Sequence, residues 1–181
     1  VRIGADAIGY TLYVGSPAQV EDFNQFRVVR SEAERYGMPV VVWAYPRGDA
    51  IDGKGGRDSL YAIDYAARVA SELGADVIKV NVPKRNSESD KHSPKPYDDL
   101  DIDDAEATRM AVKSAGSSLV LFSGGSKVND EALVAKARIA MQSGATGLIF
   151  GRNVWQRPYD EAMRISWTLT EMMAEYPAHL S

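Results

Sequence analysis

The chain contains no cysteine and only two histidines, His92 and His179, in 181 residues. Without cysteine it can form no disulfide, no thiolate zinc site and no cysteine nucleophile. The two histidines are far apart in the sequence, one in a polar stretch and one near the C-terminus. This distribution argues against a histidine-based metal site and against a Ser-His-Asp triad. The sequence therefore predicts no metal site and no bound cofactor.

Basic runs and long apolar runs are also missing. The net charge is −4, and no basic-aromatic stripe offsets it, which argues against nucleic acid as a partner. No signal peptide and no apolar stretch of membrane-spanning length is visible, so we expect a cytoplasmic protein with no membrane partner. The contents of 45% hydrophobic and 25% charged residues are ordinary for a globular chain, and one domain over residues 1–181 is the natural expectation.

What the sequence does contain is a regular alternation of short apolar runs with segments of helical period. The predicted strands are residues 7–13, 40–45, 77–82, 119–123 and 147–150. The predicted helices are residues 20–36, 59–73, 129–143 and 158–174. Asn129 is a plausible N-cap for the third of these helices. Strands that alternate with helices at this spacing indicate βα units and a parallel sheet.

A glycine repeat supports the prediction of repeated βα units. Gly4, Gly74 and Gly144 each precede a strand and are 70 positions apart, and Gly37 and Gly116 open the units between them. Such glycines are typical of helix C-caps. Five units fit an open five-stranded α/β sheet or part of a TIM (β/α)8 barrel, with only strands 4–8 evident in this chain. The non-repeating residues 84–104 are rich in Lys, Ser, Pro and Asp, and we expect a long, solvated insertion loop there.

Lys79 lies inside the apolar run Val77-Ile78-Lys79-Val80. Burial disfavours the charged ammonium, and a neutral amine is a nucleophile toward carbonyl carbon. Lys79 is therefore a candidate for a Schiff-base lysine. Taken alone, a lysine that reaches from a strand end to solvent or to a carboxylate is the more common case.

The predicted strand at 40–45 carries two aromatic residues toward its C-terminal end. Strand alternation places Trp43 and Tyr45 on one face, which would be the interior of a barrel. A tyrosine hydroxyl there can serve as a general acid or base. A core aromatic with a satisfied hydroxyl is the alternative.

Glycines and cations follow the last two predicted strands. Adjacent glycines let backbone N–H groups approach an anion, and a nearby cation adds charge, although a simple turn has the same composition. The loops after the last two strands of an eightfold barrel are its commonest phosphate site. The candidates are Ser123, Gly124, Gly125 and Lys127 in the first loop and Gly151 and Arg152 in the second.

Four segments together resemble the archaeal-type class I fructose-bisphosphate aldolases. They are Trp43-Ala44-Tyr45-Pro46-Arg47-Gly48, the residues 74–79, Ser123-Gly124-Gly125 with Lys127, and the residues 151–156, and they occur in order along the whole chain. The resemblance implies a TIM barrel, Lys79 as the Schiff-base lysine, Tyr45 as the proton-transferring tyrosine and Trp43 as a pocket residue.

The resemblance also implies that Ser123, Gly124, Gly125, Gly151 and Arg152 bind phosphate. It further implies a sugar-phosphate substrate, no metal, and a homo-oligomer, with a decamer as the family's assembly. Two features depart from the family. Its amino-terminal strands, including one that carries an aspartate of the site, have no counterpart here, and the loop at 84–104 is longer.

The implied reaction is reversible cleavage of fructose 1,6-bisphosphate to dihydroxyacetone phosphate and glyceraldehyde 3-phosphate. One alternative is a transaldolase-type synthase of an amino-dideoxy heptulosonate, which shares the lysine, the tyrosine and the phosphate loops. Relatives of that kind usually lack the tryptophan two places before the tyrosine, so Trp43 favours the aldolase. A noncatalytic, sugar-phosphate-binding fragment of a barrel is the other alternative.

The scarcity of metal-binding side chains leads to a test with a chelator. We expect aldol cleavage to continue unchanged in EDTA, because an imine to lysine takes the place of a metal as the electron sink. The measurement is turnover before and after dialysis against EDTA. Loss of turnover that added zinc restores would contradict imine chemistry.

Overall fold

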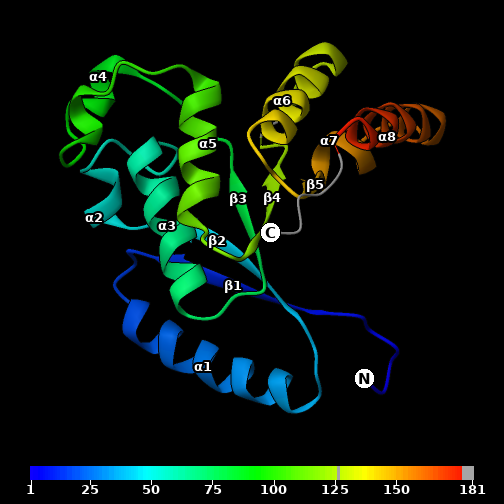
Figure 1. The fold of residues 1–181 in the computed structure, drawn as a ribbon, viewed down its shortest axis with the longest axis horizontal. Coiled ribbons are helices and arrows are strands. Elements are labelled where there is room, and N and C mark those ends of the chain that lie inside the picture. Colours follow the sequence, from blue (N-terminus) through cyan, green and yellow to red (C-terminus); the bar gives the residue numbers. More distant parts are fainter. Residues whose placement is uncertain (126, 177–181) are drawn as a thin grey trace.

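The computed structural model describes residues 1–125 and 127–176 and contains a five-stranded parallel sheet (Figure 1). The strands pair in the order β1-β2-β3-β4-β5. Their bounds are β1 Ile8–Val14, β2 Val40–Pro46, β3 Val77–Asn81, β4 Leu119–Ser123 and β5 Gly147–Ile149. Each of the five lies within two residues of the range that the apolar runs predict.

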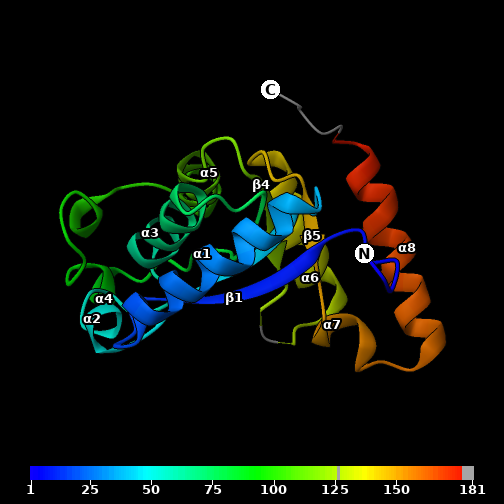
Figure 2. The same ribbon diagram turned by 90° about the horizontal axis from the view of Figure 1, so that it is seen from below.

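Helices cover one face of this sheet. In Figure 2, α1 lies along β1 at one end of the sheet, and α8 lies beyond β5 at the other. The long helices are α1 Gln19–Arg35, α3 Leu60–Glu72, α5 Asp104–Ser114, α6 Asp130–Gln142 and α8 Tyr159–Ala174. The short elements are α2 Asp49–Asp52, α4 Ser87–Asp90, the 3-10 turn η1 Tyr97–Asp99 and α7 Arg152–Trp155.

The core lies between the sheet and the long helices. Along β2, Val40, Val42 and Ala44 are fully buried on the helix side, and Trp43 and Tyr45 point to the opposite face. This alternation is the period of two that a strand imposes on its side chains. The predicted shared face of Trp43 and Tyr45 is thus confirmed.

Glycines end the helices as the repeat predicts. Gly74 after α3 and Gly144 after α6 both have φ of 92°, a backbone conformation that favours glycine because it has no Cβ. Gly37 and Gly116 have φ of 62° and 60° after α1 and α5. The N-cap at Asn129 is also confirmed, since its side chain accepts a hydrogen bond from the backbone N–H of Ala132.

The sheet topology distinguishes between the two expected architectures. A doubly wound open sheet reverses its strand order and has helices on both faces, whereas this sheet runs in sequence order with its helices on one face. That arrangement is a segment of a (β/α) barrel. Within the described residues β1 and β5 each pair with a single strand, so these five strands form an arc and not a closed ring.

Helix α5 is absent from the helices that the sequence pattern indicates. Its N-cap is Asp103, whose carboxylate accepts a hydrogen bond from the backbone N–H of Glu106 at 2.7 Å. Its buried face consists of Ala107, Thr108 and Ala111. Met110 and Val112 are its only large apolar side chains, and it follows directly on the polar segment 84–104, so no apolar stripe of large residues marks this helix in the sequence.

The expectation of a simply solvated loop over 84–104 needs correction. The segment contains α4 and η1, and Asp90 is buried within it. The carboxylate of Asp90 accepts a hydrogen bond from Nε of Arg85 at 3.0 Å. The hydroxyl of Tyr97 donates to Asp64 on α3 at 2.7 Å. Arg85 and Asp90 thus pair within the segment, and Tyr97 attaches it to α3.

Candidate active site

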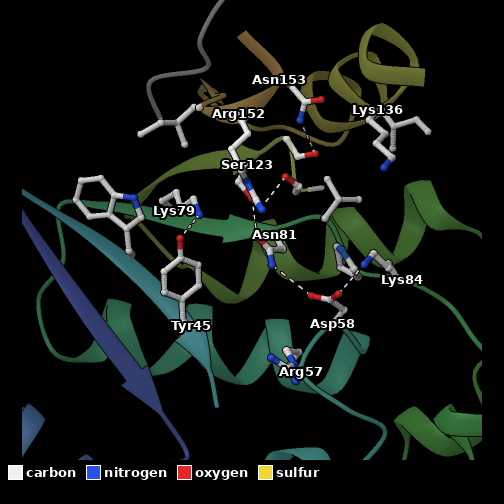
Figure 3. Close-up of a pocket in the computed structure, with 18 of the residues that line it drawn as sticks. Tyr45, Arg57, Asp58, Lys79, Asn81, Lys84, Ser123, Lys136, Arg152 and Asn153 are labelled. Atoms are coloured by element: carbon white, nitrogen blue, oxygen red, sulfur yellow. Dashed lines mark hydrogen bonds and ion pairs between the residues drawn. The ribbon is translucent and has the colours of Figure 1, made fainter. Parts of the chain in front are cut away.

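A cavity of about 1000 Å³ opens at the C-terminal ends of strands β2 to β5 (Figure 3). Strand ends at one edge of a parallel sheet bring together residues that are far apart in sequence. The cavity collects eight of the nine residues that the sequence singles out. They are Trp43, Tyr45, Lys79, Ser123, Gly124, Gly125, Gly151 and Arg152.

Lys79 lies at the centre of this constellation and is only 6% exposed. Its Nζ donates a hydrogen bond to the hydroxyl of Tyr45 at 2.6 Å and lies 4.4 Å from the centre of that ring. Among the described residues it forms no ion pair with a carboxylate. A carboxylate would hold the amine as an ammonium, whereas a hydroxyl can exchange a proton with it. The pair can therefore combine a nucleophile with a proton carrier.

Tyr45 is held in position by its neighbours. Its ring stacks on Tyr13 of β1 with centroids 6.3 Å apart, and the guanidinium of Arg47 lies 5.0 Å from its centre. Trp43 is paired in register with Lys79, one strand away. Aromatic packing and cation–π contact restrict the rotation of the Tyr45 ring, so its hydroxyl stays directed at the amine.

The two glycine loops meet on another side of the cavity. Gly125 has φ of 63°, and a Cβ on Gly124 would lie 2.8 Å from the amide nitrogen of Asn153. Both positions therefore require glycine, one for its backbone angle and the other for space. Backbone at this distance can offer its N–H groups to an anion, and Arg152 adds a positive charge beside it.

Asn153 connects these loops and is a residue that sequence reasoning missed. It is 1% exposed, its side-chain nitrogen donates to the carbonyl of Gly124, and its oxygen accepts from the backbone N–H of Val128. The sequence offers one indication of its role, since Asn153 directly follows the predicted site residues Gly151 and Arg152.

A second missed group links three segments across the cavity. Asn81, at the end of β3, donates from Nδ2 to Asp58 at 3.2 Å and accepts at Oδ1 from the hydroxyl of Ser123 at 2.5 Å. Lys84 donates to the other oxygen of Asp58 at 2.6 Å. No periodicity marks Asp58, which lies in a loop, but Asn81 could have been found as the next residue on the face of Lys79.

Charge determines the protonation of Asp58. Partial burial alone would raise the pKa of its carboxyl, but the hydrogen bond and charge of Lys84, the amide of Asn81 and the charge of Arg47 together hold the pKa below its ordinary value. Asp58 is therefore an anion in neutral solution. It can accept hydrogen bonds but has none to donate.

One predicted site residue lies elsewhere. Lys127 is exposed and lines a separate hollow with Asn129, Asp130 and Arg157, so the structure does not bring it to the cavity. His92 is exposed, and His179 lies outside the described residues.

The described residues contain neither a metal-binding cluster nor a membrane-spanning helix. In residues 1–125 and 127–176, no group of three or more acidic or histidine side chains is placed to hold a metal ion. None of the helices described is both long and apolar enough to cross a membrane.

A parallel-sheet segment with its helices on one face, a cavity at its C-terminal strand ends and a buried lysine in that cavity places this chain among the βα-barrel proteins. Residues 1–157 match the model of the DeoC/LacD family aldolases. The chain belongs to this family.

Curated relatives agree with the match. The chain is 39% identical over 160 residues to the class 1 fructose-bisphosphate aldolase of Halobacterium salinarum. The aligned residues make up 88% of this chain and 52% of that relative. It is 33% identical over 174 residues to the enzyme of the same name from Thermoproteus tenax, covering 96% of this chain and 57% of that one. The chain thus spans about half the length of the curated relatives it matches.

Solved structures agree as well, and they show the TIM-barrel aldolase fold. An archaeal fructose-1,6-bisphosphate aldolase with its catalytic lysine bound to the carbinolamine intermediate superimposes with a TM-score of 0.78 at 31% identity, covering 95% of this chain and 59% of that one. The fructose-bisphosphate aldolase from Slackia heliotrinireducens superimposes with a TM-score of 0.79 at 32% identity, covering 94% and 50%. The expected barrel architecture is thereby confirmed.

The lowered pKa of Asp58 predicts how its contribution to stability depends on pH. A carboxyl whose pKa is lower in the folded than in the unfolded state stabilises the fold above its unfolded pKa of 3.8. That contribution is lost as the pH falls through the folded pKa. Asp58→Asn should therefore reduce the free energy of unfolding most at neutral pH, and the difference from the unmodified protein should shrink below about pH 4.

Urea unfolding followed by circular dichroism at pH 7, 4 and 3 measures this difference. Asp64→Asn is the control, because Asp64 accepts hydrogen bonds from the neutral hydroxyls of Tyr97 and Ser114 and forms no ion pair among the described residues. A difference that stays constant from pH 7 to pH 3 would refute the linkage.

Proposed function

We propose that this chain carries the imine-forming part of a class I fructose-bisphosphate aldolase. It would cleave fructose 1,6-bisphosphate reversibly to dihydroxyacetone phosphate and glyceraldehyde 3-phosphate. The observation that carries the proposal is the hydrogen bond between the buried amine of Lys79 and Tyr45, beside two glycine loops in one cavity. The family match and the named relatives support the same chemistry.

In the proposed reaction, Nζ of Lys79 attacks the ketone carbon, C2, and forms a carbinolamine. Loss of water gives an iminium ion, which draws in the electron pair of the C3–C4 bond as that bond breaks. The proton of the C4 hydroxyl leaves, and the aldehyde is released. The resulting enamine takes a proton at C3, and water then hydrolyses the iminium to free Lys79 and dihydroxyacetone phosphate.

Tyr45 is the residue that we assign to proton transfer in these steps. Its hydroxyl is already in hydrogen-bond contact with Nζ of Lys79. It can therefore deliver a proton to the carbinolamine oxygen or receive one from a substrate hydroxyl as the amine changes its charge. Trp43 forms an apolar wall of the cavity beside it.

Cations on two sides of the cavity suit a substrate with two phosphates. Arg152 lies beside the glycine loops, and Figure 3 shows Arg57 and Lys84 at the opposite side, with Lys79 and Asn81 between. Binding energy from phosphates at both ends would fix the reacting carbons against Lys79. A bisphosphate fits this charge distribution better than a singly phosphorylated sugar.

Location and assembly are part of the same proposal. We expect the enzyme to act in the cytoplasm and to form a homo-oligomer, as the family resemblance implies. Sedimentation of the natural protein would measure the size of the assembly.

The proposal is tested by trapping the imine. Sodium borohydride with dihydroxyacetone phosphate should attach the three-carbon unit covalently to Lys79, and Lys79→Arg should abolish the label, because an arginine guanidinium stays protonated. Lys136→Arg is the matched control, since Lys136 also lines the cavity and its removal should leave labelling intact. Mass spectrometry of the peptides locates the label.

Label on Lys84 or Lys127 would show that the nucleophile has been assigned wrongly. No label at all would favour the alternative of a noncatalytic, sugar-phosphate-binding barrel segment. Labelling with no cleavage of fructose 1,6-bisphosphate would favour the transaldolase-type synthase.

A second test concerns Tyr45. Tyr45→Phe removes the hydroxyl that contacts Lys79 but keeps the ring that stacks on Tyr13. We expect turnover to fall by roughly 10²–10⁴-fold, the usual contribution of a general acid or base, with an unchanged circular dichroism spectrum. Tyr65→Phe on α3, outside the cavity, provides the comparison. Normal turnover in Tyr45→Phe would leave this residue a packing role only.

A further inference from the structure

Asn81 occupies a position in the cavity that the mechanism above does not use. It is the last residue of β3 and lies two places after Lys79 on the same strand face. Its side chain is therefore about 7 Å further along the cavity wall than that of Lys79. Figure 3 shows it between Lys79 and the pair of Asp58 and Lys84.

The surroundings of Asn81 determine which way its amide points. Asp58 is an anion that only accepts hydrogen bonds, so the group that faces it at 3.2 Å has to be the NH₂. The carbonyl oxygen then faces Ser123, whose hydroxyl donates to it. With both ends assigned, a flipped amide would place two acceptors against each other at Asp58.

Asp58 itself is firmly anchored. Its carbonyl accepts a hydrogen bond from the backbone N–H of Lys84 at 2.8 Å, and its second carboxylate oxygen accepts from Nζ of the same lysine. The next residue, Ser59, is the buried N-cap of α3. Asp58 is thus connected to both β3 and α3, which makes it a rigid reference point for the amide of Asn81.

One hydrogen of the Asn81 amide remains available for a ligand. An asparagine NH₂ has two hydrogens, and within the described residues the hydrogen bond to Asp58 engages one of them. Asn81 is half-buried and lines the cavity, so the second hydrogen can reach a molecule bound there.

We propose that Asn81 donates this second hydrogen to the C5 hydroxyl of the sugar, which is the hydroxyl beside the aldehyde carbon, and that Asp58 is the positioning residue for its amide. The inference rests on the aldolase function proposed above. It adds a specificity residue for the hydroxylated aldehyde.

The order of groups along the cavity identifies the half of the sugar that Asn81 meets. Lys79 bonds to the ketone carbon, and the glycine loops with Arg152 lie on one side of it. A ketone phosphate held there extends the remainder of its chain toward Arg57 and Lys84. Asn81 lies along that path, beyond the amine, where the carbons of the aldehyde half would pass.

The simpler alternative is that Asn81 only ties β3 to β4 through Ser123. A tie of that kind would affect all substrates alike. A donor to a substrate hydroxyl affects only substrates that have the hydroxyl, because removing either partner of one hydrogen bond removes the same interaction. The ratio of two substrates therefore separates the two roles.

The test is the condensation direction with dihydroxyacetone phosphate and two aldehydes. One is glyceraldehyde 3-phosphate, and the other is 3-oxopropyl phosphate, which is the same molecule without the hydroxyl beside the aldehyde. The natural enzyme should prefer the hydroxylated aldehyde in kcat/KM. Asn81→Leu, close in shape, should reduce that preference by about 10-fold, mainly by slowing the hydroxylated substrate.

Three further variants complete the design. Asn81→Ala repeats the test without an apolar side chain beside Asp58. Asp58→Asn should reduce the preference by about 3-fold, because an amide at residue 58 lets the Asn81 amide flip. Asp130→Asn is the matched control, a carboxylate paired with Arg157 and Arg164 outside the cavity, and should leave the preference unchanged.

Borohydride labelling of Lys79 with dihydroxyacetone phosphate is measured in every variant. Intact labelling with an unchanged preference in both Asn81→Leu and Asn81→Ala would overturn the role of Asn81 and leave the aldolase function standing. If Asn81 variants respond and Asp58→Asn does not, Asp58 loses its positioning role. Absence of labelling in the natural enzyme would overturn the proposed function, and this inference with it.

Discussion

The pairing register of β2 against β3 is the constraint on which the site depends. Val42 lies opposite Ile78 and Trp43 opposite Lys79. Because Val42 and Ile78 are fully buried under the helices, Trp43 and Lys79 face the other side of the sheet. A slip of one residue would exchange the two faces and would put the polar end of Lys79 into the apolar helix layer. Packing of the outer face therefore positions the amine of Lys79 on the inner one.

The same register concentrates charge. The chain as a whole carries a net charge of −4, yet the cavity gathers cations from several strand ends, with Arg47, Lys84 and Arg152 among them. Asp58 opposes this excess and at the same time holds Lys84 in place. Low-dielectric walls strengthen the field of such a group, so this edge of the sheet carries a positive potential in an otherwise acidic protein. The cavity and the excess of positive charge thus lie at the same edge of the sheet, where the strands end.

Much of this architecture can be predicted from the sequence. The strands are readable because each is an apolar run bounded by glycine or polar residues, and Lys79 is conspicuous within one of them. Helix α5 is harder to predict because it contains only two large apolar residues and directly follows the polar segment 84–104. Asp58 and Asn153 cannot be identified from the sequence pattern, because their roles depend on contacts between distant segments. Lys127 is the converse case, since it lies only two residues after Gly125 in the sequence but lines a separate hollow in the structure.

The buried Asn153 has a consequence for the timing of binding. It joins Gly124 and Val128, which follow β4, to α7 through hydrogen bonds, so these residues are held together by the protein itself. The conformational entropy of Gly124, Val128 and Asn153 is therefore lost when the protein folds, and binding beside them would not have to include that cost. Under the proposed function, a phosphate group bound beside Gly124 would meet groups that Asn153 already holds together. Its release would then break its own contacts and not the hydrogen bonds between the loops, so local charge and hydrogen bonding would govern its residence time.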